Sequence, residues 1–307
     1  MKKLILPLFA IVAMYSCSDD DAPAQPTVQE PLEITKADYD TNFSPGGALY
    51  SNYRVNNNAV SIPTSGEDQT WDFSTLTEID NVVNGGAAFL TPANAAFPTA
   101  TYSYLSSSNY TVSGINSNTF ETTDFVEISN SGSYLLNVSQ NEPATISVPS
   151  LGASFEYPVQ NRDYKGTTKL PIVLFPAKYG NAAVTTNGAI DELNFVVTAP
   201  AFGLNNVPGQ TKITTNAINE VIASGTINLK GIGVKRALVV KNSYSETVNY
   251  FLGGAPAPAQ LLSTLGVTDG TSISYTVYRF VAEGLGSVGF IDVNSAGEIT
   301  GASFRKG

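Results

Sequence analysis

Cys17 is the residue whose chemistry is easiest to infer, because it is the only cysteine among the 307 residues of the chain. A lone thiol cannot form an internal disulfide, so a chemical use of this side chain is favoured. Two lysines, Lys2 and Lys3, and an apolar run over residues 4–14 precede it. That run is too short for a helix that crosses a bilayer, which needs about 20 residues, and it fits the apolar region of a secretory signal. The alternative is an ordinary secreted protein with an incidental cysteine.

The segment MKKLILPLFAIVAMYSC resembles a bacterial lipoprotein signal. The resemblance implies that residues 1–16 form a signal peptide and that Cys17 carries the lipid that anchors the protein in the outer membrane. Ser18, Asp19, Asp20 and Asp21 come next, and they resemble an export signal of surface lipoproteins from Bacteroidota. Residues 17–31 are then an acidic, proline-rich tether. The expected location is the cell surface, with lipid in the outer membrane.

The absence of histidine limits the chemistry open to the rest of the chain. It excludes Ser-His-Asp and Cys-His catalysis in their usual forms and metal sites that use histidine. No glycine-rich phosphate loop followed by lysine and Ser or Thr occurs, and we expect no cofactor and no metal.

Carboxylate chemistry remains open, since a glycosidase needs two carboxyl groups about 5–9.5 Å apart. The acids that could supply such a pair are Asp68, Asp72, Glu121, Asp124, Asp191 and Glu192. Adjacent acids on a strand point to opposite faces, so Asp191 and Glu192 do not form a ready-made pair. We expect all six to be solvated charges and the protein not to be an enzyme.

A short motif at Asp292-Val-Asn294-Ser-Ala-Gly297 begins like a calcium-binding loop. It lacks the ligand at the fifth place and the closing glutamate, where Ser303 stands. A hairpin turn explains the same asparagine and glycine equally well.

The aromatic residues offer a binding function instead of a catalytic one. Trp71 is the only tryptophan, and Tyr102, Tyr104 and Tyr110 lie in a stretch rich in serine and asparagine. Exposed aromatic rings could stack on sugar rings, which makes these four residues a candidate glycan site. The competing interpretation, which we favour, is that Trp71 lies in the core, where a large aromatic side chain buries most of its area.

The acidic composition limits the partners. The chain has 16 Lys and Arg against 26 Asp and Glu, a net charge of −10 at pH 7, whereas nucleic-acid binding depends on clustered basic residues. The expected partners are therefore the membrane, through the lipid, and either a glycan or another envelope protein. We expect no nucleic acid.

The pattern of the remaining chain predicts an all-β fold. Short alternating runs, such as ELNFVVTA at 192–199 and SISYTVYRFVAEG at 272–284, are separated by Gly, Asn, Ser and Pro clusters, which is typical of a sandwich or barrel. We predict antiparallel sheets in a β-sandwich-like arrangement with at most one or two short helices. Residues 32–307 form this β-rich domain, and a division near residue 150 is the alternative. The best helix candidate is PAQLLSTLG at 258–266, whose leucines we assign to the core.

TWDFSTL (70–76), FPTA (97–100) and LPIVLFPAKYG (170–180) are similar to an uncharacterised β-rich module of secreted Bacteroidota proteins. That resemblance assigns a function to none of these residues. Cys17 is the only residue with a role implied by resemblance, and that role comes from the lipoprotein signal. The sequence thus predicts a lipid-anchored envelope protein, most simply a non-catalytic surface or structural interaction module. The alternatives are a glycan-binding accessory protein for nutrient capture and a hydrolase that uses two carboxylates.

Overall fold

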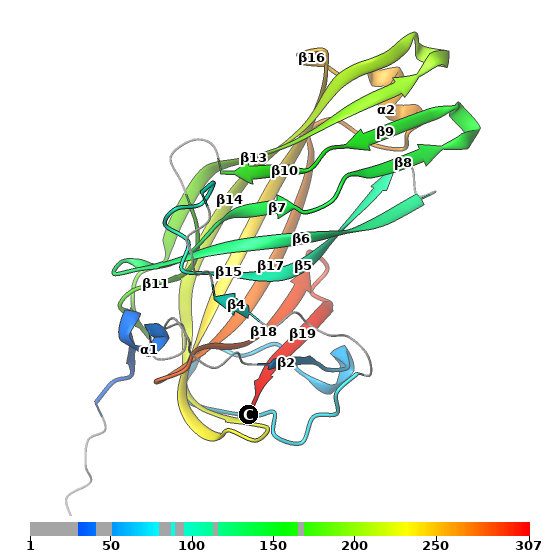
Figure 1. The fold of residues 1–307 in the computed structure, drawn as a ribbon. Helices are drawn as coiled ribbons and strands as arrows, with labels where there is room; N and C mark the ends of the chain where they lie inside the picture. Colours follow the sequence, from blue (N-terminus) through cyan, green and yellow to red (C-terminus); the bar gives the residue numbers. More distant parts are fainter. Residues whose placement is uncertain (1–29, 41–50, 80–86, 90–94, 113–115, 165–168) are drawn as a thin grey trace, which may run out of the picture. The chain divides into compact units, whose positions relative to one another are not determined.

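The computed structural model describes residues 30–40, 51–79, 87–89, 95–112, 116–164 and 169–307 (Figure 1). The chain divides into residues Met1–Glu30 and a compact unit, Pro31–Gly307, and the strands and helices that the structure describes belong to the second unit. Cys17, Ser18, Asp19, Asp20 and Asp21 lie outside the described residues. Within the described part of the chain, no helix has both the length and the apolar character needed to cross a membrane.

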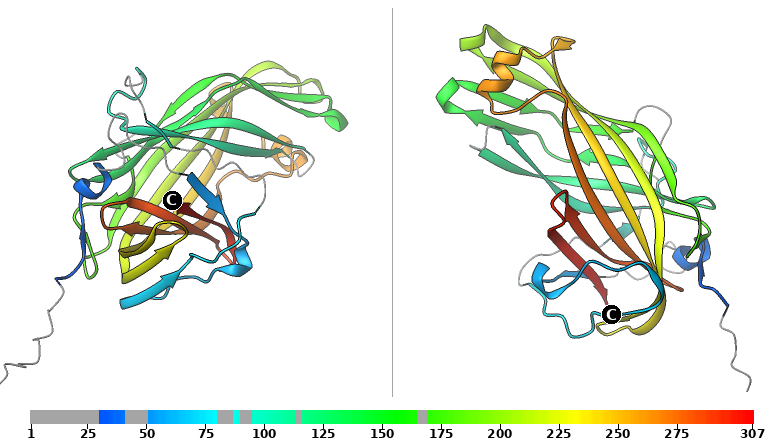
Figure 2. Two further views of the ribbon diagram at one scale, coloured as in Figure 1. Left: turned by 60° about the horizontal axis from the view of Figure 1, so that its bottom comes forward. Right: turned by 180° about the vertical axis from the view of Figure 1, so that it is seen from behind.

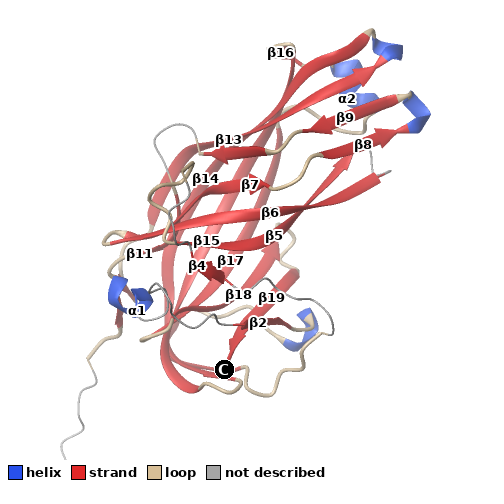
Figure 3. Cartoon of the chain, in the orientation of Figure 1, coloured by secondary structure: helices blue, strands red, loops and turns tan. Residues whose placement is uncertain are grey.

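Eleven of the described strands form one large sheet (Figures 1 and 3). In sheet order they are β2 (Ser51–Arg54), β19 (Ile299–Lys306), β18 (Gly286–Asn294), β17 (Thr271–Ala282), β15 (Gly233–Leu252), β14 (Leu204–Leu229), β13 (Val184–Ala199), β9 (Ala153–Tyr157) and β8 (Ala144–Val148), with β16 (Ala255–Pro256) beside β15 and β3 (Gly66–Asp72) beside β14.

A second sheet of six described strands packs on the first. Its members are β10 (Gln160–Asp163), β7 (Gly132–Gln140), β6 (Asn116–Ser129), β5 (Tyr102–Val112), β4 (Ala87–Phe89) and β11 (Leu170–Leu174). The remaining elements are the pair β1 (Glu33–Ile34) and β12 (Ala177–Lys178), the α-helices α1 (Lys36–Asp40) and α2 (Ala259–Thr264), and the 3₁₀ turns η1 (Asn57–Ala59), η2 (Pro149–Leu151) and η3 (Pro200–Phe202).

The predicted fold class is confirmed: the described chain is all-β and sandwich-like, with two short α-helices. One pairing departs from the antiparallel rule, because β3 runs parallel to β14. The two strands approach so closely at Gly225 that a Cβ atom there would lie 1.9 Å from the carbonyl oxygen of Gln69. Only glycine fits at such a contact.

Both faces of the long central strands are covered, which explains their apolar runs. On one face, Val239 of β15 and Phe280 of β17 pack in a cluster with β18, β19, β2 and Phe73. On the other face, Leu238 and Val240 pack against Val126 of β6. Four successive residues of β15, from Ala237 to Val240, are therefore buried, as expected of a strand between two layers. Figure 2 shows from two sides how the long strands β14, β15 and β17 of the large sheet face strands β5, β6 and β7 of the second sheet.

The two sheets also meet along one edge. The side-chain amide of Gln160 in β10 donates to the carbonyl oxygen of Asn194 in β13 at 2.9 Å, and its own oxygen accepts from the Asn194 N–H at 2.9 Å. The side chain thus replaces a strand partner at this position, which satisfies both backbone groups.

Helix α2 depends on this packing because six residues are too few for a stable isolated helix. It begins after Pro258, and Gly266, with a φ of 67°, follows its C-terminal cap. Its leucines Leu261 and Leu262, together with Leu265, are buried, and each contributes roughly 1.5–3 kcal/mol relative to an exposed side chain. The helix and the core assignment of its leucines match the prediction from sequence.

Candidate functional site

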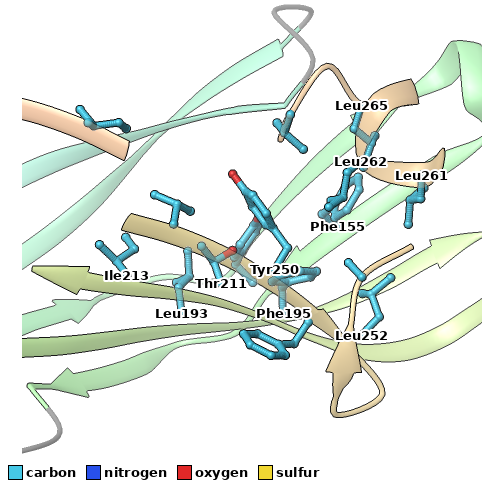
Figure 4. A pocket seen from close by; sticks show the side chains of 16 residues that line it. Phe155, Leu193, Phe195, Thr211, Ile213, Tyr250, Leu252, Leu261, Leu262 and Leu265 are labelled. Carbon is cyan, nitrogen blue, oxygen red and sulfur yellow. The ribbon is translucent and has the colours of Figure 1, made fainter. Parts of the chain in front are cut away.

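An apolar pocket of about 310 Å³ lies between α2 and the strands β9, β13, β14 and β15 (Figure 4). The leucines of α2 that pack on the core also form one wall of this pocket. Its lining includes Phe155, Leu193, Phe195, Leu252, Leu261 and Leu262. Ile273 of β17 contributes to the lining and keeps 49% of its surface exposed, so the pocket reaches the solvent on that side.

Polar groups are few in this pocket. Thr211 of β14 and Tyr250 of β15 are register partners and lie side by side in the lining. Asp269 lies next to Tyr250, since its Oδ1 accepts from the Tyr250 N–H at 2.8 Å. Burial, reinforced by the negative charge of Asp269, raises the pKa of the Tyr250 hydroxyl. The hydroxyl therefore stays protonated and is available to donate a hydrogen bond.

A second group of side chains forms a polar network in the interior between the sheets. At one end, Nη1 of Arg162 in β10 lies 3.1 Å from Oδ2 of Asp191 in β13. The exposed fractions of the two side chains are only 7% and 12%. Burial raises the pKa of Asp191, and the charge of Arg162 lowers it by less than that. Nε of Arg162 and Oδ1 of Asp191 are buried without a hydrogen-bond partner, so the pair is only partly satisfied.

The network continues through tyrosines and acids of β15 and β17. Tyr275 donates to Oε1 of Glu246 at 2.8 Å, and the rings of Tyr275 and Tyr244 stack with centroids 4.9 Å apart. Burial raises the pKa of Glu246, which the Tyr275 hydrogen bond only partly offsets. Tyr164, which follows β10, has its pKa raised by burial and by the nearby Asp191.

Arg279 of β17 lies at the other end of the network. Burial alone would lower its pKa, but Tyr244, Tyr104 and Asp292 more than offset burial and leave the pKa raised. The guanidinium therefore stays charged. Burial raises the pKa of Asp292, against the effect of Arg279.

The prediction that the six acids are solvated is wrong for Asp191, which is 9% exposed. Its strand neighbour Glu192 is half-exposed, in line with the expected alternation. Asp72 is on the surface, where its Oδ1 accepts from the N–H and the hydroxyl of Ser74. Asp68 and Glu121 are exposed, and Asp124 is half-buried and hydrogen-bonded to Tyr104.

The aromatic residues predicted as a glycan site lie in different environments. Trp71 is half-buried in β3, and its ring meets that of Phe280 edge-on at 5.5 Å. Tyr102 is 6% exposed in the core cluster between the sheets, and Tyr104 packs beside it. The side chain of Tyr110 lies outside the described residues. The structure thus places Trp71 and Tyr102 in separate core clusters.

The motif at Asp292 and Asn294 builds a hairpin turn between β18 and β19. Oδ1 of Asn294 accepts from the N–H groups of Ala296 at 3.0 Å and Glu298 at 2.9 Å, while Asp292 belongs to the network of Arg279. Among the described residues, no group of three or more Cys, Asp or Glu side chains is arranged to hold a metal ion.

No protein-family model, no curated protein and no solved structure matches this chain. The function of the pocket and of the network is therefore inferred from their own residues. Reasoning from sequence missed both the pocket and the basic members of the network. The sequence contained one signal of the network. Arg279 stands in the apolar run VYRFVA, and a charged residue within a buried strand needs a buried partner.

Proposed function

We propose that this protein is a lipid-anchored cell-envelope module that binds a small ligand in the pocket beside α2 and catalyses no reaction on it. The observation that carries the proposal is the chemistry of the lining. Of its 16 residues, only Thr211, Tyr157 and Tyr250 have a side-chain oxygen, and none has a carboxylate, an amine or a thiol. A hydroxyl nucleophile needs an adjacent base, and the lining offers none.

The interior acids give weak support to catalysis. Asp191 faces Arg162 and Glu246 accepts from Tyr275, so each has a structural partner. Ion-pair networks of this kind perturb pKa values as active sites do. We therefore assign the network to the fold and the pocket to binding.

The anchor in this proposal comes from the leader and Cys17, which the sequence supports. A stable anchor needs two or more acyl chains, each buried CH₂ contributing about 0.8 kcal/mol. The acidic residues 18–21 and the prolines after them would hold the β-rich unit away from the headgroups. Glycan binding stays a prediction, and no specific contact in the described residues favours it.

The binding function is tested with residues 31–307, the compact unit that contains all four core clusters. We expect the fluorescence of the neutral apolar probe N-phenyl-1-naphthylamine to rise when it is added to this fragment. Ile213→Trp, which fills the pocket from β14, should abolish the rise. Ile218→Trp is the matched control, because Ile218 lies on the same strand but is 44% exposed and outside the lining. Equal probe uptake by both variants would contradict the proposal.

A further inference from the structure

We propose that the pocket takes an uncharged amphiphile: an aliphatic chain of about ten to twelve carbons with a hydroxyl or similar neutral head at Tyr250. This inference rests on the proposed binding function and names the ligand class for the same pocket. It follows from the volume, the composition and the charge of the lining.

The volume sets the size of the ligand. At about 310 Å³ the pocket is at the lower end of the range for ligand sites, roughly 300–1,000 Å³. An apolar cavity of about 150 Å³ holds one benzene molecule, so twice that volume holds about twelve carbon atoms. An oligomeric ligand would not fit inside.

The composition sets the affinity. Aliphatic side chains from α2 and aromatic rings such as Phe155 and Phe195 surround the space. Each methylene transferred from water into such a lining strengthens binding about fourfold. Over a series of alcohols, the affinity should therefore rise with chain length until the pocket is full and then stop rising.

The charges decide the head group. No lysine or arginine is present in the lining, so a carboxylate or phosphate head would lose its hydration without gaining a counter-charge. Asp269, held at the Tyr250 backbone, adds repulsion of an anion. Asp269 also accepts from Nδ2 of Asn249 at 3.3 Å, but it is not part of the lining. An ammonium head inside the pocket would therefore lose its hydration without meeting a carboxylate in the lining. The protonated hydroxyl of Tyr250 is left to bind a neutral oxygen.

The test is displacement of N-phenyl-1-naphthylamine from residues 31–307 by decan-1-ol, decanoate and decylammonium. At pH 8 we expect decan-1-ol to displace the probe at a concentration at least tenfold lower than either ion. At pH 4, where decanoate gains a proton, we expect it to approach decan-1-ol. Tyr250→Phe should weaken decan-1-ol about fivefold, the value of one hydrogen bond, when the displacement is calculated with the probe affinity measured for that same variant.

The outcomes separate the two proposals. If the probe binds and is blocked by Ile213→Trp, but decanoate or decylammonium displaces it as well as the alcohol does at pH 8, the uncharged head group is overturned and the binding function stands. If Tyr250→Phe leaves the alcohol unaffected, the assigned position of the head is overturned. If the probe does not bind at all, the binding function fails and this inference fails with it.

Discussion

The buried pair of Arg162 and Asp191 offers a direct test of the interior network through the variant Arg162→Met. Methionine keeps an apolar stem of similar length and removes the charge, which leaves Asp191 beside no cation in a site where its side chain is 12% exposed. Removing one partner of a buried pair costs about 3–5 kcal/mol, because the other charge stays behind without compensation. We expect the free energy of unfolding to fall by that amount at pH 8.

The loss should depend on pH, and its sign follows from Asp191. Burial already holds the folded-state pKa of Asp191 above its usual value, so the folded state binds this proton more tightly than the unfolded state. The stability from this carboxyl is fully present below the unfolded pKa of about 3.9 and is lost as the pH rises through the raised value. Without Arg162 the pKa rises further, so the deficit of Arg162→Met should be smaller at pH 5 than at pH 8.

The free energy of unfolding at each pH is measured by urea unfolding followed by the fluorescence of Trp71. This side chain packs against Phe280 in a core cluster, so its fluorescence reports the loss of the core. Arg236→Met is the matched control. Its Nη1 lies 3.7 Å from Oε1 of Glu283 in a pair whose side chains are 29% and 51% exposed, and such a solvated pair contributes about 1 kcal/mol or less. The double variant Arg162→Met with Asp191→Leu should recover most of the stability. A cost for Arg162→Met equal to that of the control, or equal at both pH values, would refute the assignment of a desolvated pair.

Three further predictions follow from the same structure. Glu246→Gln should stabilise the protein at pH 8 and lose this advantage near pH 4, because burial raises the pKa of Glu246 and glutamine imitates the protonated form; a urea midpoint difference that does not change with pH would contradict this. Gly225→Ala should cost about 1–3 kcal/mol, since its Cβ would meet Gln69 at 1.9 Å; an unchanged urea midpoint would show that β3 does not pair as described. Cys17→Ala should move the protein from the membrane fraction to the soluble fraction, and alanines at residues 19–21 should leave it anchored but shielded from protease added to intact cells; a membrane-bound Cys17→Ala would end the lipid-anchor proposal.

Local patterns in the sequence were sufficient to predict the strands. In the run 192–199 the apolar residues Leu193, Phe195 and Val197 alternate with more exposed ones, and the structure buries all three in β13. The period of two is visible because β13 has one apolar face over this run. In β15, where both layers cover the strand, the same signal becomes the continuous run ALVV.

Local patterns could not predict which strands pair when they are far apart in the sequence. β3 and β14 join residues more than 130 positions apart in a parallel pair, and no local feature of TWDFSTL indicates which strand it meets. The same limit applies to Asp191. The alternation of β13 puts it on the same buried face as Leu193, but the sequence does not show that the distant Arg162 lies there as its ionic partner. The pocket was missed for a related reason, because a space between packed leucines depends on the whole arrangement of α2 over the sheet.

The strand register explains how one sheet face holds both a charged network and an apolar pocket. Glu246 of β15 pairs with Thr215 of β14. Two residues further along β15, Val248 pairs with Ile213 of β14, and Ile213 pairs with Asp191 of β13. One row further, Tyr250 pairs with Thr211 and Thr211 with Leu193. The face thus changes from titratable side chains to apolar ones within about two rows, each about 7 Å along the strands. An anionic ligand head at Tyr250 would lie beyond the arginines that neutralise the network, which is a physical reason for this pocket to disfavour an anion.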